Sequence, residues 1–365
     1  MGPVEDRWRE LAVKRSNGFI TPEWFRSWWE GHRESSSPLI SVARRADGSV
    51  AGVMPLVLDT SSLPRAIRFA GASIGDHFHP AAEAADEADV AAATMTALER
   101  AGLDRSMVLL EHADSDGEWW RGMRSHSPIR RAIVEQQQTR AYYIDLRERD
   151  WDSYLAARSR NFRQKVGRSE RRLLREHGMT VRSADQRTLD ADLNELFRLH
   201  DLRRDPLGGS SLRGAGRHSV RSFAREAHQQ GWLRLLTLEA DGGPVASFLG
   251  WRAGNCYVHY QSGFDPAWSH RSVGFVLTAL TVRSAIEEGA TKFDFLLGTE
   301  EWKSRFTDES RPSQTSIVLR ARRPVWALVA AHAQARKLAE RIENRHRLRS
   351  LARSMHVLIP TARRS

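Results

Sequence analysis

Residues 255–311 read NCYVHYQSGFDPAWSHRSVGFVLTALTVRSAIEEGATKFDFLLGTEEWKSRFTDESR, and the rest of the chain is interpreted around them. Side chains alternate around Tyr257 in the two-residue period of a strand, which Asp265-Pro266 end in a turn. Apolar residues from Val273 to Ile286 leave little polar face, which predicts a helix packed against a sheet. The run from Phe293 to Leu297 then has the pattern of a buried strand. The stretch therefore predicts a strand, a crossover helix and a second strand.

The start of this helix is the first candidate binding site. A crossover helix of this kind points its first backbone N–H groups at a ligand, here from Arg271 to Phe275. The run Arg271-Ser272-Val273-Gly274 resembles the first four places of the Arg/Gln-x-x-Gly-x-Gly/Ala pyrophosphate loop of GNAT acyltransferases, although Val276 departs from the last place. The resemblance implies that Arg271, Ser272, Val273, Gly274 and Phe275 bind acyl-CoA, with the glycine letting the backbone approach the phosphates.

A longer run narrows this resemblance. The segment Gly-Ala-x-x-Phe-Asp-Phe-x-x-Gly-x-Glu, followed by Trp302-Lys303 and Phe306, resembles the CelD-like (cellulose-biosynthesis-type) acetyltransferase branch of the GNAT superfamily, a relative of the Fem-type aminoacyltransferases. It implies an α/β (α+β) fold of two GNAT-like halves, each a mixed, mainly antiparallel sheet flanked by helices. We expect an N-terminal half at residues 1–146, the acyltransferase domain at 147–320, and a basic helical tail at 321–365.

Composition and charge set limits on the cellular setting. The chain has 365 residues and a single cysteine, Cys256, so it cannot form an intrachain disulfide, and a reducing compartment fits. No signal-type apolar region opens the sequence and no apolar run reaches the roughly 18 residues of a spanning helix, so we expect a cytoplasmic protein. The net charge is +11, and residues 320–365 hold twelve Lys or Arg against two Glu, a net of +10. A nearly neutral body argues against nucleic acid as a partner.

The first half combines an aromatic helix with a hairpin. Trp24 and Trp28 share one face of a helix that Thr21 and Pro22 begin, and we expect that face to pack on the sheet. Residues 39–43 and 50–58 read as a hairpin. Further along, a helix is expected at 86–102 and strands at 107–112 and 140–146.

A polar cluster, Asp76-His77-Phe78-His79, is the first candidate for contact with substrate. Its Asp and His side chains could ligate a metal, but no second ligand pair accompanies them, so we predict no metal site. The family resemblance suggests a loop lining the cleft between the halves. Asp76 and His77 are therefore predicted to bind the acceptor.

The second half opens with a basic segment. Trp151, Tyr154, Phe162, Val166 and Leu173 lie at helical spacings, which predicts one basic helix with an apolar stripe. The eight Lys or Arg between residues 158 and 176 can be a solvated face, or a cationic row for an anionic acceptor or the 3′-phosphate of CoA. On the second interpretation Arg160 and Arg163 bind substrate. A strand at 179–182, helices at 189–204 and 219–230, and a hairpin at 232–251 complete the half.

The GNAT resemblance implies that the acyl group passes directly from thioester to acceptor, which needs positioning, an oxyanion donor and in some cases a base. No covalent nucleophile is then required, and the sequence around Cys256 favours a core residue. His259 lies mid-strand where the acyl group is expected and could act as a base, or be a structural histidine. Asp294 is a carboxylate in an apolar strand, which requires a partner or a function. Glu300 could orient substrate, and the three side chains are the predicted catalytic residues. Gln261 and Lys303 are predicted to contact substrate, the lysine by binding a phosphate.

These features predict an enzyme that moves an acyl group, in the simplest case acetyl, from acyl-CoA to an amine or hydroxyl of a small-molecule, sugar or cell-envelope precursor. Two alternatives stay open: a Fem-type transferase that uses aminoacyl-tRNA, and a non-catalytic GNAT fold in polysaccharide biosynthesis or export. The tail beyond Arg320 joins Trp326 and aliphatic residues to clustered arginines. It is predicted to pack on the body or to touch an anionic membrane peripherally.

Overall fold

The computed structural model describes residues 2–61, 65–103, 106–114, 117–125, 131–204, 212–298 and 300–320. Its helices are α1 (Pro3–Lys14), the short η1 (Gly18–Ile20), α2 (Pro22–Glu30), α3 (Glu87–Arg100), α4 (Glu118–Ser125), α5 (Trp151–Ala156), α6 (Arg160–His177), α7 (Leu189–Arg204), α8 (Ala215–Gln229), η3 (Pro266–Arg271), α9 (Val273–Glu287) and α10 (Glu301–Ser304). Its strands are β1 (Ser36–Arg44), β2 (Val50–Asp59), β3 (Ala66–Phe69), β4 (Ala81–Ala82), β5 (Met107–Asp114), β6 (Arg131–Asp145), β7 (Thr180–Ser183), β8 (Leu233–Ala240), β9 (Gly243–Ala253), β10 (Cys256–Phe264), β11 (Lys292–Leu297) and β12 (Ser310–Arg320). The predicted tail at 321–365 lies outside these residues.

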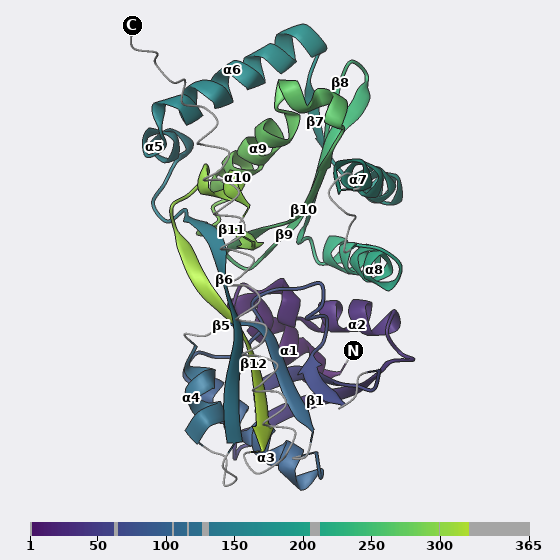
Figure 1. Cartoon of the computed structure of the whole chain (residues 1–365), viewed down its shortest axis with the longest axis vertical. Coiled ribbons are helices and arrows are strands. Elements are labelled where there is room, and N and C mark those ends of the chain that lie inside the picture. The colour runs from purple at the N-terminus through teal and green to yellow at the C-terminus, as the bar shows by residue number, and fades with distance from the viewer. Residues whose placement is uncertain are drawn as a thin grey trace, which may run out of the picture.

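A single sheet runs through the described part of the molecule, in the order β1-β2-β3-β5-β12-β6-β11-β10-β9-β8-β7, with β4 paired to β2. Two neighbouring pairs, β3 with β5 and β10 with β11, are parallel, and the others are antiparallel. Helices flank it in two groups, one around each half (Figure 1). The predicted α/β architecture with a mixed, mainly antiparallel sheet is confirmed.

β6 joins the two halves of this sheet. Its last residues, 141–145, pair with β11, while residues 131–142 pair with β12. β12 therefore returns to the first half and lies between β5 and β6, although it follows the second half in sequence (Figure 1). The division at residues 146 and 147 stays a proposal, and strand 310–320 completes the sheet of the N-terminal half.

One hydrophobic cluster crosses the junction and holds the halves together. The ring of Trp24 on α2 packs edge-on against Phe223 of α8 at 5.0 Å between centroids, and Phe223 packs against Trp251 of β9 at 5.0 Å. All three side chains are buried, as is Cys256 in the same cluster. Because the apolar face of the first-half helix α2 is buried against second-half elements, the halves form one body.

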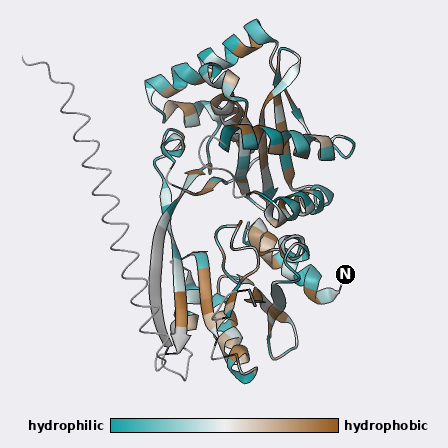
Figure 2. Cartoon of the chain, turned by 45° about the vertical axis from the view of Figure 1, so that its right-hand side comes forward, coloured by the Kyte–Doolittle hydropathy of each residue, from teal (hydrophilic) through white to brown (hydrophobic). Residues whose placement is uncertain are grey.

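The prediction that the basic segment of the second half forms one helix is wrong. The segment forms two helices, α5 and α6, separated at residues 157–159. The backbone of Ser159 is extended (φ −58°, ψ 151°), and its hydroxyl accepts the N–H of Phe162 at 3.2 Å. Such an N-cap begins a new helix, because it satisfies a backbone donor that has no partner within the helix. α6 is largely hydrophilic (Figure 2), and its buried residues Phe162, Val166 and Leu173 face the core.

Among the described residues, no helix combines the length and apolar character needed to cross a membrane.

Candidate acyl-transfer site

The site begins where two parallel strands separate. β10 pairs with β11 only from Cys256 to Val258, opposite Lys292 to Asp294. Beyond this point β10 continues along β9, with an irregularity in register between His259 and Gln261. Strands that stop pairing leave backbone groups and side chains free to line a cleft, as at the carboxyl edge of other open sheets. The residues that line the two cavities described below come largely from this opening.

A local turn ends the regular course of β11. Leu296 has a left-handed backbone (φ +60°), an uncommon conformation for a residue with a side chain. Its N–H donates to Oδ1 of Asp294 at 2.8 Å, and the next N–H, of Leu297, donates to Oδ2 of Asp76 at 3.2 Å. The Asp294 carboxylate thus holds the turn from within the strand, and Asp76 fastens it to the first half.

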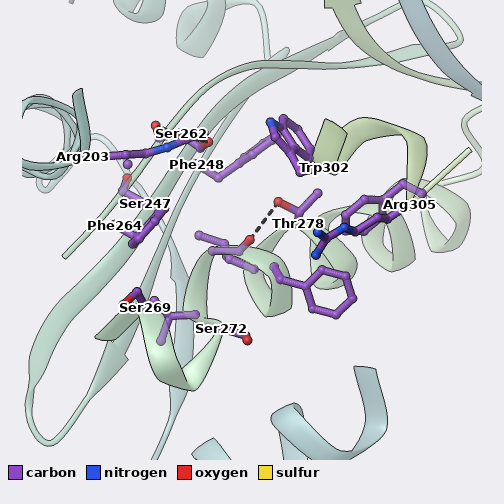
Figure 3. A pocket seen from close by; sticks show the side chains of 16 residues that line it. Arg203, Ser247, Phe248, Ser262, Phe264, Ser269, Ser272, Thr278, Trp302 and Arg305 are labelled. Atoms are coloured by element: carbon purple, nitrogen blue, oxygen red, sulfur yellow. Dashed lines mark hydrogen bonds between the residues drawn. The ribbon is translucent and has the colours of Figure 1, made fainter. Parts of the chain in front are cut away.

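The first cavity, which we call the α9 cavity, has a volume of 310 Å³ and lies between the start of α9 and β10 (Figure 3). Its lining combines hydroxyl groups, aromatic rings and two arginines: Arg203, Ser247, Phe248, Ser262, Gly263, Phe264, Ser269, Ser272, Val273, Gly274, Phe275, Leu277, Thr278, Trp302, Arg305 and Phe306. Arg203 and Arg305 lie on opposite sides of it in Figure 3. No carboxylate is among these lining residues, so the cavity suits a ligand that is partly apolar and negatively charged.

The N-terminus of α9 opens into this cavity. Ser272, before the first helical residue, has a left-handed backbone (φ +59°) and makes no side-chain cap, so the first N–H groups of α9 receive no hydroxyl acceptor from it. Such groups, with the helix dipole behind them, form an anion site. Of the five residues predicted to bind CoA, Ser272, Val273, Gly274 and Phe275 line the cavity, whereas Arg271 pairs with Glu176 at 3.0 Å and does not.

A groove of 390 Å³, which we call the α6 groove, continues outward past Phe275 and Arg305 to α6. Lys165 lines it, with its ammonium 4.8 Å from the centroid of the Phe275 ring. Burial and the nearby positive charge of Arg305 lower the pKa of Lys165. A second anionic group of a long ligand would relieve the repulsion between these two cations.

The second cavity, which we call the interhalf cavity, has a volume of 170 Å³ and is lined by residues of both halves. Its lining is mainly polar: Ile74, Asp76, His200, Arg203, Arg204, His259, Tyr260, Gln261, Ser262, Phe295, Leu296, Leu297, Glu300, Trp302 and Lys303. Arg203, Ser262 and Trp302 line both this cavity and the α9 cavity. The two cavities therefore adjoin, which is the arrangement a donor and an acceptor require.

His259 lines the interhalf cavity from β10. Its side chain is buried, with its ring stacked on Phe248 at 4.9 Å and edge-on to Trp302 at 5.3 Å between centroids. Burial, with the charges of Lys303 and Arg203, lowers the pKa of His259 to about 3. Its Nε2 has no hydrogen-bond partner among the described residues. The imidazole is therefore neutral near pH 7, and its unpaired nitrogen is available to a ligand.

Glu300 and Lys303 form one unit at the edge of the same cavity. The Lys303 ammonium is buried and donates to the carbonyl oxygen of Leu297 at 2.6 Å and to Oε2 of Glu300 at 3.0 Å. Burial opposes ionisation of Glu300, yet the neighbouring Lys303 charge outweighs it and the pKa of Glu300 is lowered. Lys303 thus fixes the end of β11. That it also binds a phosphate of the substrate stays a prediction from the sequence.

Asp294 lies on β11 but lines neither cavity. Its Oδ2 accepts from Nη2 of Arg311 at 2.8 Å, and Nε2 of His77 lies 3.5 Å from Oδ1. Burial alone would raise the pKa of Asp294, but the charges of Arg311 and the other neighbours hold it below its usual range. The predicted catalytic role remains untested, and these contacts are those of a buried structural ion pair.

The predicted substrate-binding residues divide into two groups. Asp76 and Gln261 line the interhalf cavity, together with Lys303, whereas His77 is buried behind it against Asp294. Arg160 and Arg163 are exposed on α6 and line neither cavity nor the α6 groove. Arg163 instead donates to the carbonyl oxygen of Arg158 at 2.5 Å, at the end of α5.

Three basic residues at the site were not predicted: Arg203, Arg204 and Arg305. The first two close α7 just before Asp205-Pro206, where a helix end commonly carries arginines, so the sequence offered only a helix-end signal. No group of three or more His, Cys, Asp or Glu side chains in the described parts of the chain is arranged to hold a metal ion.

Residues 160–304 match a family model described as an acetyltransferase (GNAT) domain. The matched region contains α6 to α10 and both sides of the strand opening described above. No curated protein sequence matches the chain significantly.

Solved structures share the fold over most of the chain. FemX aligns with a TM-score of 0.65 at 11% identity, over 90% of this chain and 99% of its own. The C-terminal domain of a proposed lysylphosphatidylglycerol synthetase from Agrobacterium fabrum gives 0.57 at 12% identity, over 91% of this chain and 95% of its own. L-PGS from Bacillus licheniformis gives 0.52 at 13% identity, over 85% and 95%. At these identities the similarity is one of fold.

Proposed function

We propose that this protein is an acyl-CoA-dependent N-acyltransferase that moves an acyl group, in the simplest case acetyl, to an amine of a small-molecule, sugar or cell-envelope precursor, a hydroxyl acceptor being the variant of this reaction. The observation that carries the proposal is the shared wall of the two cavities. Trp302 and Arg203 line both the α9 cavity and the interhalf cavity, so ligands in the two would meet there. The GNAT domain match supports acyl transfer as the reaction.

The α9 cavity is assigned to the donor. Uncapped N–H groups at the start of α9 suit the pyrophosphate of CoA, and Gly274 presents no side chain there. Arg305 and Lys165 continue the positive charge into the α6 groove, where further phosphate can bind. Acyl-CoA supplies a thioester, whose carbonyl carbon accepts the acceptor nitrogen while CoA leaves as the thiol.

The interhalf cavity is assigned to the acceptor. We assign His259 to orient the amine through its neutral imidazole, because its pKa near 3 excludes the charged form at neutral pH. Glu300 is ionised and lines the same cavity, so it is the carboxylate assigned to take the proton that the nitrogen loses.

A Fem-type transferase that takes its acyl group from aminoacyl-tRNA is the second candidate, and the similarity in fold to FemX favours it. The GNAT domain match and the carboxylate-free lining of the α9 cavity support CoA. A CelD-like role in polysaccharide or envelope biosynthesis would fit the CoA-dependent reaction.

The test is a transfer assay with two donors. Purified protein is mixed with acetyl-CoA and a panel of amines, and release of the free thiol is followed before and after ribonuclease treatment; aminoacyl-tRNA is tested in parallel. We expect amine-dependent thiol release that ribonuclease leaves unchanged. Transfer from aminoacyl-tRNA alone, abolished by ribonuclease, would establish the second candidate instead, and no transfer from either donor would point to a non-catalytic fold.

A further inference from the structure

We propose that the interhalf cavity recognises an anionic group of the acceptor, a carboxylate or phosphate, through the adjacent arginines Arg203 and Arg204. The inference rests on the proposed function in one respect, that the ligand of this cavity is the acceptor. The anion-binding site itself is inferred from the charged residues that line the cavity. It narrows the substrate class to amines that carry a negative charge close to the reacting nitrogen.

Arg203 is a guanidinium with no carboxylate partner within ion-pair distance among the described residues. It donates to the carbonyl oxygen of Ser262 at 3.3 Å and to the Ser262 hydroxyl at 3.1 Å. The guanidinium carbon, Cζ of Arg203, lies 5.5 Å from the centroid of the Phe264 ring. Burial, and next to it the charge of Arg204, lower the pKa of Arg203. A partly buried cation beside a second cation gains most from an anion that enters from the cavity.

Arg204 lines the interhalf cavity but not the α9 cavity. In the part of the chain that the structure describes, no ion pair to Arg204 is formed. Other arginines on these helices are paired: Arg198 with Glu195 at 2.6 Å, and Arg217 with Asp201 at 2.7 Å. Counting only carboxylates of the described residues, the arginines of α7 without such a partner are the two that line the cavity.

The remaining charges of the cavity are already engaged. Lys303 is bonded to Glu300 and to the Leu297 carbonyl oxygen, and Asp76 accepts the N–H of Leu297. Glu300 attracts Arg203 and Arg204 through space, but among the described residues its ion pair is with Lys303 and it forms none with either arginine. A carboxylate or phosphate between Arg203 and Arg204 would be held by charge-assisted hydrogen bonds, leaving its amine to face His259 and Glu300 in a cavity of 170 Å³.

The test is isothermal titration with small amines that differ in charge. O-phosphoethanolamine, β-alanine and ethanolamine are titrated into the full-length protein in a buffer free of phosphate and carboxylate. We expect saturable binding of one or both anionic amines and at least about tenfold weaker binding of ethanolamine. Preference for O-phosphoethanolamine over β-alanine would identify phosphate as the recognised group, and the reverse preference would identify carboxylate.

Three matched Arg→Gln variants locate the site. Arg204→Gln should weaken binding of the anionic amine by about tenfold or more. Of the two cavities, Arg204 lines only the interhalf cavity. Arg305→Gln removes the same charge from the α9 cavity and should leave amine binding within about twofold, as should Arg187→Gln, an exposed control paired with Asp185. Within the described residues Arg204 makes no side-chain hydrogen bond or ion pair that its loss would break, so folding should be retained, which a thermal unfolding scan checks.

Binding that is equal in the wild type and in Arg204→Gln would overturn the inference, and so would the absence of saturable binding by either anionic amine. Loss of binding in Arg305→Gln but not in Arg204→Gln would place the anion in the donor cavity and overturn it too. Acetyl-CoA titrated into the same proteins separates this result from the proposed function. If acetyl-CoA does not bind but the anionic amine binds through Arg204, the donor assignment fails while the anion site stands.

Discussion

Arg311 of β12 and Asp294 of β11 form an ion pair across the junction of the two halves, with Nη2 2.8 Å from Oδ2. The carboxylate is buried, and its other oxygen holds the Leu296 N–H at the turn that ends β11. The ion pair therefore stabilises the turn at which β11 separates from β10, although neither residue lines the α9 cavity or the interhalf cavity.

Replacing Arg311 by Met should lower the free energy of unfolding by up to about 3–5 kcal/mol, because the buried Asp294 carboxylate loses its hydrogen-bonded partner and keeps only Lys292 at 3.8 Å and His77 at 3.5 Å. Asp294→Asn should cost less, since its amide oxygen can still accept the Leu296 N–H. Urea unfolding measures both. If Asp294 acts only in support, Asp294→Asn should also keep turnover within about tenfold of wild type, and a loss of a hundredfold or more in a folded variant would assign it to catalysis.

Ser272→Gly should stabilise the protein or leave it unchanged. The left-handed backbone at residue 272 costs a residue with a side chain roughly 1 kcal/mol, and the serine hydroxyl makes no helix cap that glycine would lose. Ser272→Val, a β-branched residue in the same conformation, should destabilise by about 1–2 kcal/mol. Chemical unfolding of both variants tests the sign, and a valine variant as stable as the glycine variant would show that the turn is not left-handed in solution.

Lys303→Met should destabilise the protein by about 1–3 kcal/mol, because the part-buried carbonyl oxygen of Leu297 loses its donor and Glu300 loses its counter-ion. Glu300→Gln keeps an acceptor for the lysine and should be near neutral in stability while lowering turnover. Thermal unfolding and steady-state kinetics on the same pair separate the two effects. If Lys303→Met were as stable as the wild type, the Lys303 ammonium would not be needed for folding. That result would favour the phosphate-binding role predicted from the sequence.

Stability should fall as the pH is lowered below about 6.5, the pKa of an ordinary histidine, and His259 is one cause. The unfolded chain protonates this residue below that pH, whereas the folded protein holds it neutral down to about pH 3. The unfolded state therefore binds more protons in this window. His259→Leu should reduce the slope of unfolding free energy between pH 5 and 6 by up to about 1.4 kcal/mol per pH unit. An unchanged slope would show that the imidazole is not buried as described. His77, His79 and His200 act in the same direction in both proteins.

Local periodicity predicted elements that line the two cavities. α9 and β11 have patterns strong enough to be read directly, and their observed bounds differ from prediction by one residue or so. The sequence analysis did not predict β12 or the first part of β6. Both become strands by pairing with each other across more than 160 residues of chain, which no local pattern reports.

The sequence predicted some of the residues that line the cavities and missed others, again because local patterns do not report contacts between distant segments. Gly274, His259 and Lys303 lie in one continuous stretch, so their motif located them together. From α7, which packs on β10, Arg203 reaches both cavities and Arg204 reaches the interhalf cavity, and only the fold brings them there. Arg160 and Arg163 were selected by a charge pattern that a solvated helix face produces equally well.

The most direct test of the donor assignment is isothermal titration of acetyl-CoA into the wild type, Gly274→Trp and Ala267→Trp. Residue 274 lines the α9 cavity, while Ala267 is exposed on η3 and does not, so the two variants add the same ring in different places. We expect saturable binding by the wild type and by Ala267→Trp, and its loss in Gly274→Trp. Binding that survives in Gly274→Trp, or a wild type that binds no acetyl-CoA, would contradict the assignment of the α9 cavity to acyl-CoA.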